Sequence, residues 1–222
     1  MTTIVYLHGF RSSPASEKAQ LVRQAVDALP RGHDIDLWIP DLDASPRVAV
    51  SGVEQWVEQA HRDDAAAITF VGSSLGGFYA TWLAERFAAR AVLVNPATRP
   101  YDDLRDYLGM QTNLYTGRRF EVTQAHFDEL RAFDVAAIAD PSRYLLYVQS
   151  ADELLDWRVA VARYGGAWQC VEGGGDHGFT GFERHVPTIF EFARNGFDRS
   201  ARCHDDLASP RAKPSVQDKN TP

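Results

Sequence analysis

The stretch TFVGSSLGGFYATW, residues 69–82, joins an apolar run to a helical pattern through two serines and three glycines. The apolar run stops at Gly72, as a buried strand would, and the residues after Gly76 have helical spacing. Gly-x-Ser-x-Gly between a strand and a helix is the nucleophile-elbow pattern, a tight turn that projects its serine above the sheet. Ser74 has a glycine two residues to either side and Ser73 does not, so we predict Ser74 as the nucleophile.

Outward from this turn, short apolar runs alternate with helical patterns along the chain. The apolar runs are residues 4–7, 36–39, 67–71, 91–94, 144–149 and 168–171. The helical patterns are residues 17–29, 48–61, 77–87 and 183–194. Strands that are apolar throughout and separated by helices are typical of a parallel sheet covered on both faces. We therefore predict an α/β protein, a three-layer α/β/α sandwich with a mainly parallel sheet of about six strands.

Two segments depart from this alternation. Residues 99–141 are irregular or helix-like and rich in aromatic and charged residues, so we expect a helical, cap- or lid-like insertion after the fourth strand. From about Ser200 the chain is polar, contains proline and has too few large apolar residues to offset the entropy of ordering. With 222 residues the chain has room for one sizeable core. We expect one domain over residues 1–198 and a disordered tail over residues 199–222.

The composition narrows the class of partner. A formal net charge of −7 argues against nucleic acid or an anionic membrane surface, because both are bound through an excess of Lys and Arg. The two cysteines, Cys170 and Cys203, form neither a disulfide framework nor a zinc-binding spacing, which fits a reducing compartment. We see no signal peptide at the start of the sequence and no apolar run long enough to span a membrane. The expectation is a soluble cytoplasmic protein of undetermined oligomeric state.

A serine hydroxyl is a poor nucleophile unless a base accepts its proton. Among the seven histidines, His8 and His177 follow the first and last strands, and reactive groups of parallel sheets gather at the carboxyl ends of strands. We predict His177 as the base, because the glycine-rich loop EGGGDHGF, residues 172–179, would let its imidazole approach Ser74 from outside the elbow. A late histidine also fits the chain order of the hydrolases with this elbow. His8 is expected to hold its own loop by hydrogen bonds.

The imidazole in turn needs an acid that fixes its tautomer and stabilises its charged form. The fifth strand ends in YVQSADELLDW, residues 147–157, which holds three carboxylates. Asp152 lies nearest the strand end and is the predicted acid, with Glu153 as the second choice. Asp156 is expected to cap the following helix. Asp176 adjoins the histidine, but neighbours in a loop usually point apart, so it ranks below the others.

An acyl-transfer reaction also needs two donors for the oxyanion of its tetrahedral intermediate. The backbone N–H of Leu75, at the start of the helix, is one candidate. The second is expected from the loop LHGFRSSP, residues 7–14, where Gly9 allows close approach of the backbone. We predict the N–H of Phe10 as that second donor.

Several segments of the chain resemble the α/β-hydrolase superfamily, and more closely the small bacterial esterases of the YqiA/YcfP type. The segments are IVYLHGFRSSPASEKAQ, GSSLGGFYATWLAE, AVLVNPATRP, VQSADELLDWR and GGGDHGF, which extend over nearly all of residues 3–194. The resemblance implies a reduced α/β-hydrolase fold whose sheet lacks the first two strands of the full fold. It also implies esterase or thioesterase activity on acyl esters, with acyl-CoA among the candidate substrates, and no metal or organic cofactor.

These residues lead to one principal functional hypothesis and one alternative. The principal hypothesis is a serine esterase or thioesterase that uses Ser74, His177 and Asp152 through an acyl-enzyme intermediate, with residues 99–141 determining the substrate. The alternative is a non-catalytic protein with the α/β-hydrolase fold that serves in binding or regulation. The complete set of serine, aspartate and histidine favours the enzyme.

Overall fold

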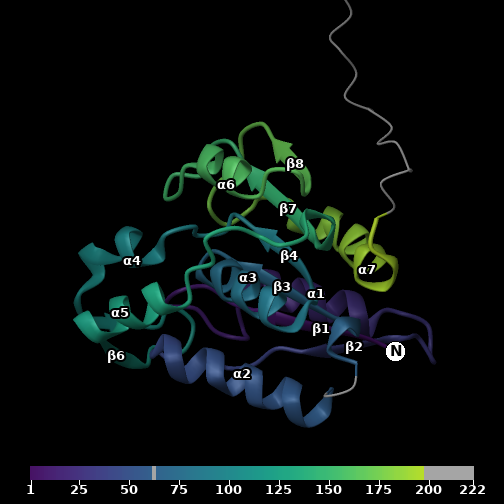
Figure 1. Cartoon of the computed structure of the whole chain (residues 1–222), viewed down its shortest axis with the longest axis horizontal. Helices are drawn as coiled ribbons and strands as arrows, with labels where there is room; N and C mark the ends of the chain where they lie inside the picture. The colour runs from purple at the N-terminus through teal and green to yellow at the C-terminus, as the bar shows by residue number, and fades with distance from the viewer. Residues whose placement is uncertain (62–63, 198–222) are drawn as a thin grey trace, which may run out of the picture.

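A computed structural model describes residues 1–61 and 64–197 of the chain (Figure 1). Its centre is a six-stranded sheet in the order β2-β1-β3-β4-β7-β8, in which every pair of neighbours is parallel. The strands are β1 (Thr2–Leu7), β2 (Ile35–Trp38), β3 (Ile68–Ser73), β4 (Arg90–Val94), β7 (Tyr144–Gln149) and β8 (Trp168–Glu172). The predicted parallel sheet of about six strands is confirmed.

Helices cover both faces of this sheet (Figure 1). Apolar side chains of α2 (Pro46–Ala60), α3 (Leu75–Phe87) and α6 (Trp157–Arg163) share one core cluster. Those of α1 (Glu17–Asp27) and α7 (Val186–Asn195) share the other. Two separate apolar cores on the two faces give the predicted three-layer α/β/α sandwich.

The inner strands β1, β3, β4 and β7 are almost entirely buried, because successive side chains enter different cores. In β1, Val5 and Leu7 belong to the cluster with α2 and α3, while Ile4 and Tyr6 belong to the cluster with α1 and α7. All six residues of β3 are buried. Alternate residues of a strand point to opposite faces, so a sheet covered on both sides requires apolar residues at every position.

The insertion after β4 contains helices, as expected, and also a two-stranded hairpin that was not predicted. It contains α4 (Pro100–Asp103) and α5 (Gln124–Ala132), but between them β5 (Gly109–Thr112) and β6 (Arg119–Val122) form an antiparallel hairpin. Residues of β5 alternate between half-buried and exposed, so the hairpin lacks the continuous apolar run that marks the central strands. The predicted tail, residues 199–222, lies outside the described residues.

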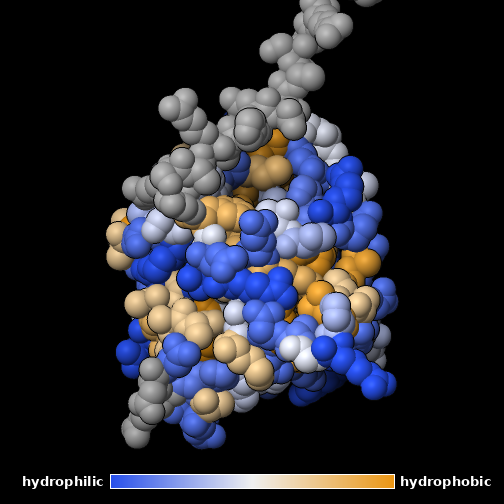
Figure 2. Space-filling model, turned by 90° about the vertical axis from the view of Figure 1, so that its right-hand side faces the viewer, coloured by the Kyte–Doolittle hydropathy of each residue, from blue (hydrophilic) through white to orange (hydrophobic). Residues whose placement is uncertain are grey.

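The surface drawn in Figure 2 corresponds to the right-hand side of Figure 1. There, hydrophilic residues are interspersed with smaller groups of hydrophobic ones (Figure 2). Within residues 1–61 and 64–197, no helix has the length and hydropathy required to cross a bilayer.

Candidate active site

The backbone makes a sharp turn at Ser74. Strand β3 ends at Ser73, helix α3 begins at Leu75, and Ser74 between them has φ 55° and ψ −121°. Residues with a side chain rarely adopt this conformation, which persists only where the surroundings impose it. Here the Ser74 N–H donates to the Val94 carbonyl at 3.1 Å, and the Ser74 carbonyl accepts from the N–H of Ala97 at 3.0 Å. The turn is therefore fixed against the end of β4.

The positions on either side of the serine leave no room for a side chain, so only glycine fits there. A Cβ atom on Gly72 would overlap the carbonyl of Gly76, and a Cβ atom on Gly76 would overlap the carbonyl of Leu7. A Cβ atom on Gly9, in the loop after β1, would lie 3.2 Å from the Cβ of Ser74. The small residues thus allow β3, α3 and the loop after β1 to meet at the serine.

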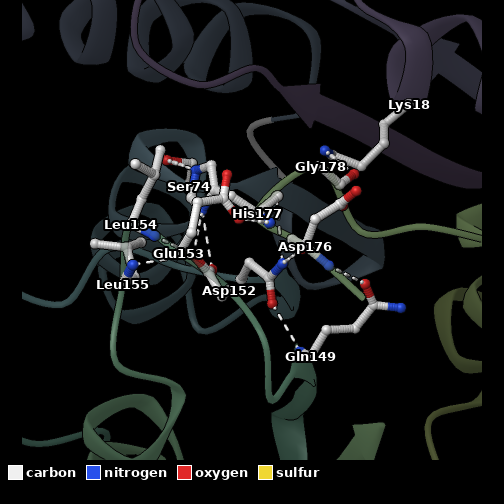
Figure 3. A network of polar contacts seen from close by, with 11 residues as sticks. Lys18, Ser74, Gln149, Asp152, Glu153, Leu154, Leu155, Asp176, His177 and Gly178 are labelled. Atoms are coloured by element: carbon white, nitrogen blue, oxygen red, sulfur yellow. Dashed lines mark hydrogen bonds and ion pairs between the residues drawn. The ribbon is translucent and has the colours of Figure 1, made fainter. Parts of the chain in front are cut away.

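Ser74, His177 and Asp152 lie in one chain of hydrogen bonds (Figure 3). The Nε2 atom of His177 is 3.0 Å from the Oγ of Ser74, and its Nδ1 atom is 2.9 Å from the Oδ2 of Asp152. A carboxylate accepts only, so Nδ1–H donates to it and leaves Nε2 free to accept from the serine hydroxyl. The structure therefore brings together the three residues selected from the sequence, with the histidine oriented by the aspartate.

The Asp152 carboxylate is buried and well supplied with donors. Its side chain is only 2% exposed, and its Oδ1 accepts from the backbone N–H groups of Leu154 and Leu155, each at 2.9 Å. Burial by itself would raise the pKa of Asp152, but the hydrogen bond from His177 and those from the two backbone N–H groups outweigh it and lower the pKa. The carboxylate is therefore ionised at neutral pH.

The other acids near the histidine take other roles. Glu153 accepts a hydrogen bond from the backbone N–H of His177 at 2.9 Å and does not replace the aspartate at the ring. Asp176 accepts from the hydroxyl of Thr180 at 2.9 Å, so its side chain is directed away from the imidazole of its neighbour. Asp156 caps α6 by accepting from the N–H of Arg158 at 3.0 Å, as expected.

Asn95, which the sequence analysis did not select, holds the loop that carries His177. Its side-chain Nδ2 donates to the carbonyls of Asp176 at 2.9 Å and His177 at 3.2 Å, and its Oδ1 accepts from the N–H of Gln149 at 3.0 Å. Asn95 is buried and has φ 40°. The available signal was its position directly after a buried strand, at the edge of the sheet where functional groups gather.

Lys18, in helix α1, makes a further contact with the same loop. Its Nζ atom donates to the carbonyl of Gly178 at 2.7 Å (Figure 3). Burial lowers the pKa of Lys18, while the nearby carboxylates of Glu17, Asp176 and Asp152 act in the opposite direction. Helix α1 thus contributes a positioning contact that the sequence analysis did not identify.

A largely apolar hollow of about 260 Å³ opens beside Ser74 and His177. Its apolar lining includes Phe10, Leu75, Leu104, Leu114, Leu154 and Leu155. Phe10 and Leu75, the two residues expected to supply oxyanion donors, both line this hollow together with Ser74. The arrangement can accept an acyl group of apolar character next to the serine oxygen.

His8 holds the loop of Phe10 in the way expected from the sequence. Its Nε2 accepts from the N–H of Leu42 at 3.2 Å, and its Nδ1 is 3.1 Å from the carbonyl of Gly9. Because Nε2 accepts, Nδ1 carries the proton and donates. Burial lowers the pKa of His8, which favours this neutral form.

Comparison with known proteins gives one family and several similar structures. The sequence matches the family described as "Uncharacterised protein family (UPF0227)" over residues 3–194. A protein from Agrobacterium vitis S4 has a TM-score of 0.67 and 18% identity, covering 87% of this chain and 88% of its own. The esterase domain of a Rhodothermus marinus protein has a TM-score of 0.63 and 15% identity, covering 88% and 87% respectively.

A mammalian structure shows the same likeness. Alpha/beta hydrolase domain-containing protein 10 from mouse has a TM-score of 0.62 and 17% identity, covering 86% of this chain and 88% of its own. Identities this low show the fold alone. The α/β-hydrolase fold expected from the sequence is thereby confirmed.

Proposed function

The chain belongs to the family UPF0227, and we propose that it is a serine hydrolase acting on carboxylic esters or thioesters. The observation that carries the proposal is the contact from Asp152 through the ring of His177 to the oxygen of Ser74. A hydroxyl, a base and an orienting acid in this order are the requirements of nucleophilic acyl transfer. The similar fold of a Rhodothermus marinus esterase domain supports the same reaction class.

The proposed reaction begins with attack of the Ser74 oxygen on the acyl carbon. The Nε2 atom of His177 accepts the hydroxyl proton, and the N–H groups of Leu75 and Phe10 stabilise the negative charge that develops on the carbonyl oxygen. His177 then gives the proton to the leaving alcohol or thiol as its bond to carbon breaks. A water molecule, deprotonated by the same nitrogen, releases the acid from Ser74.

Asp152 has an electrostatic role in both halves of this reaction. Its ionised carboxylate lies against the Nδ1 atom of His177, so it stabilises the imidazolium that forms when the serine proton is taken. The contacts made by Asn95 and Glu153 to the backbone of His177 hold the ring where Nε2 reaches the serine. This chemistry requires neither a metal ion nor an organic cofactor.

The hollow beside Ser74 suggests which part of the substrate binds there. Its leucine side chains favour an apolar acyl group, because burial of acyl methylenes contributes about 0.8 kcal/mol each. Acyl-CoA thioesters remain candidate substrates together with simple esters. The residues of the insertion that line the hollow, among them Leu104 and Leu114, would determine the acyl chain that fits.

Turnover of a panel of p-nitrophenyl esters and acyl-CoA thioesters of increasing chain length tests the proposal. Wild-type protein is expected to hydrolyse at least one series, and Ser74→Ala to lose about 10⁶-fold in kcat, as triad serines do. Ser73→Ala is the matched control, since it removes the neighbouring hydroxyl and leaves the elbow spacing intact. Failure of the wild-type protein across the whole panel would instead favour a non-catalytic binding or regulatory protein.

A further inference from the structure

A second group of ligand-type side chains lies at the edge of the sheet, outside the Ser74 site. Cys170 and Glu172 are alternate residues of the edge strand β8, so they point to the same face. His185 ends the short 3₁₀ turn Phe182–His185, just before α7. The Sγ atom of the cysteine, a carboxylate oxygen of the glutamate and a ring nitrogen of the histidine all lie within 4.8 Å of one another.

We propose that Cys170, Glu172 and His185 bind a divalent transition-metal ion such as Zn²⁺, with water in the fourth position. Thiolate, imidazole and carboxylate are the three ligand types that zinc accepts, commonly in tetrahedral sites. The thiolate disfavours Mg²⁺ and Ca²⁺, which select oxygen ligands. The spacing of the two cysteines gives no hint of this site, because its nitrogen and oxygen ligands come from other residue types.

The distances between the donors require only small movements. The Nε2 atom of His185 is 2.9 Å from the Oε1 of Glu172. Metal bonds of 2.0–2.2 Å in a tetrahedral site separate a nitrogen and an oxygen ligand by about 3.3–3.6 Å. The two atoms therefore need to part by a few tenths of an ångström. A thiolate within 4.8 Å of both can close the remaining gap by rotation of the short Cys170 side chain.

Neighbouring groups already orient two of the three ligands. The His185 ring packs against Tyr147, with ring centroids 4.6 Å apart, and lies nearly perpendicular to the ring of Phe179, with centroids 5.5 Å apart. The second carboxylate oxygen of Glu172 accepts from the Nε2 of Gln149 at 2.8 Å. Such outer contacts hold metal ligands in position. The side chains of His185 and Glu172 are 15% and 24% exposed, which leaves a path for an ion.

Burial and the neighbouring Glu172 carboxylate raise the pKa of the Cys170 thiol, so an ion must displace the thiol proton in order to bind. Binding would release the Cys170 proton to solvent and require the Nε2 lone pair of a neutral His185. A thiolate and a carboxylate then balance the two positive charges of the ion. Arg184 opposes the ion, since its Nη2 is 3.4 Å from the Oε2 of Glu172. Its side chain is 63% exposed, and its Nε also donates to the carbonyl of Gly181 at 3.2 Å, so the guanidinium would have to leave the carboxylate when the ion binds.

Titration of the full-length protein with CoCl₂ tests this site, because Co²⁺ replaces Zn²⁺ and reports its ligands in its absorption spectrum. We expect one equivalent of Co²⁺ to give a near-ultraviolet thiolate-to-cobalt band, and ZnCl₂ to remove that band. Cys170→Ser should abolish it, and His185→Gln, which keeps the thiol, should weaken Co²⁺ binding at least tenfold. ZnCl₂ should also raise the melting temperature of the wild-type protein.

The matched control is Cys203→Ser, which removes the only other cysteine and should leave the band unchanged. A wild-type spectrum without the band would overturn the proposal. So would a band that survives Cys170→Ser, or one that is lost in Cys203→Ser. None of these outcomes depends on ester hydrolysis, so the test is independent of the proposed function.

Discussion

The side-chain amide of Asn95 donates to the backbone carbonyl of His177 at 3.2 Å. The same nitrogen donates to the carbonyl of Asp176, and the amide oxygen accepts from Gln149 at the end of β7. One buried side chain therefore ties the histidine loop to two adjacent strands of the sheet. The position of the predicted base therefore depends on a residue whose side chain hydrogen-bonds to neither the serine nor the aspartate.

Replacement of Asn95 by alanine should reduce turnover more than substrate binding. The two carbonyls that it serves would lose their donor, at a cost of about 1–3 kcal/mol for unsatisfied buried groups. We expect kcat for an ester substrate to fall at least tenfold with KM changed less than threefold. Asn195→Ala, at the end of α7, is the control and should leave both constants unchanged. Equal kcat values for Asn95→Ala and wild type would show that the loop keeps its position without the amide.

Replacement of Asp152 by asparagine should abolish most activity while leaving the shape of the site intact. An amide cannot stabilise the imidazolium of His177 and favours the wrong tautomer, so kcat should fall by about 10⁴. Steady-state kinetics at saturating ester measures this loss. Glu153→Gln is a matched control, since Glu153 accepts from the backbone of the histidine and not from its ring. A loss in Glu153→Gln as large as that in Asp152→Asn would contradict the assignment of the acid.

The Asp152→Asn replacement should also change how the free energy of unfolding depends on pH. Because the pKa of Asp152 is lowered in the folded protein, its ionised form stabilises the fold above the pKa of an unfolded aspartate, about 3.9. This contribution is lost as pH falls through the lower, folded-state pKa. Urea unfolding of wild type and Asp152→Asn should show a stability difference at pH 6 that shrinks below pH 4. A difference that grows on acidification would mean that the pKa is raised.

The glycines of the elbow should not tolerate a methyl group. Gly76→Ala would place a Cβ atom against the Leu7 carbonyl, so the backbone must shift at an overpacking cost of about 1–3 kcal/mol or more. Thermal unfolding should show a melting temperature lower by several degrees. Gly52→Ala is the opposite case, since its Cβ would meet nothing within 4 Å in the middle of α2. It should stabilise the protein by about 0.5–1 kcal/mol.

Leu114 should affect the choice of acyl chain without affecting stability. It is 69% exposed in the turn between β5 and β6, and it lines the hollow beside Ser74. Leu114→Ala is expected to lower kcat/KM about tenfold for the longest ester that the wild type accepts, and little for acetate. Met110→Ala, an exposed apolar residue of the same hairpin that does not line the hollow, is the control. A uniform loss across chain lengths would exclude Leu114 from acyl selection.

The fold and the residues Ser74, His177 and Asp152 could be predicted because short segments of the sequence carry the patterns that indicate them. Most strands of the central sheet are apolar at nearly every position, as burial on both faces demands. The glycines on either side of Ser74 mark a turn that tolerates no side chain at those two positions. Asp152 and His177 could be selected because they directly follow strands whose carboxyl ends meet at one edge of a parallel sheet.

The remaining features depend on contacts between distant segments. The β5–β6 hairpin alternates half-buried and exposed residues, a pattern too short to distinguish from an irregular loop. Asn95 and Lys18 act on the His177 loop from 82 and 160 positions away in sequence, through backbone carbonyls that carry no residue-specific signal. Cys170 and His185 are 15 positions apart in sequence, and their ligand atoms come within 4.8 Å of each other through tertiary packing.

Labelling with a fluorophosphonate probe, followed by mass-spectrometric mapping of the modified residue, tests the central claim most directly. Such probes bond covalently to a serine only when a base and an oxyanion site activate it. We predict one label per chain on Ser74 of the wild-type protein, no label in Ser74→Ala, and full labelling in Ser73→Ala. Labelling that survives Ser74→Ala, or that maps to another residue of the wild-type protein, would contradict the assignment.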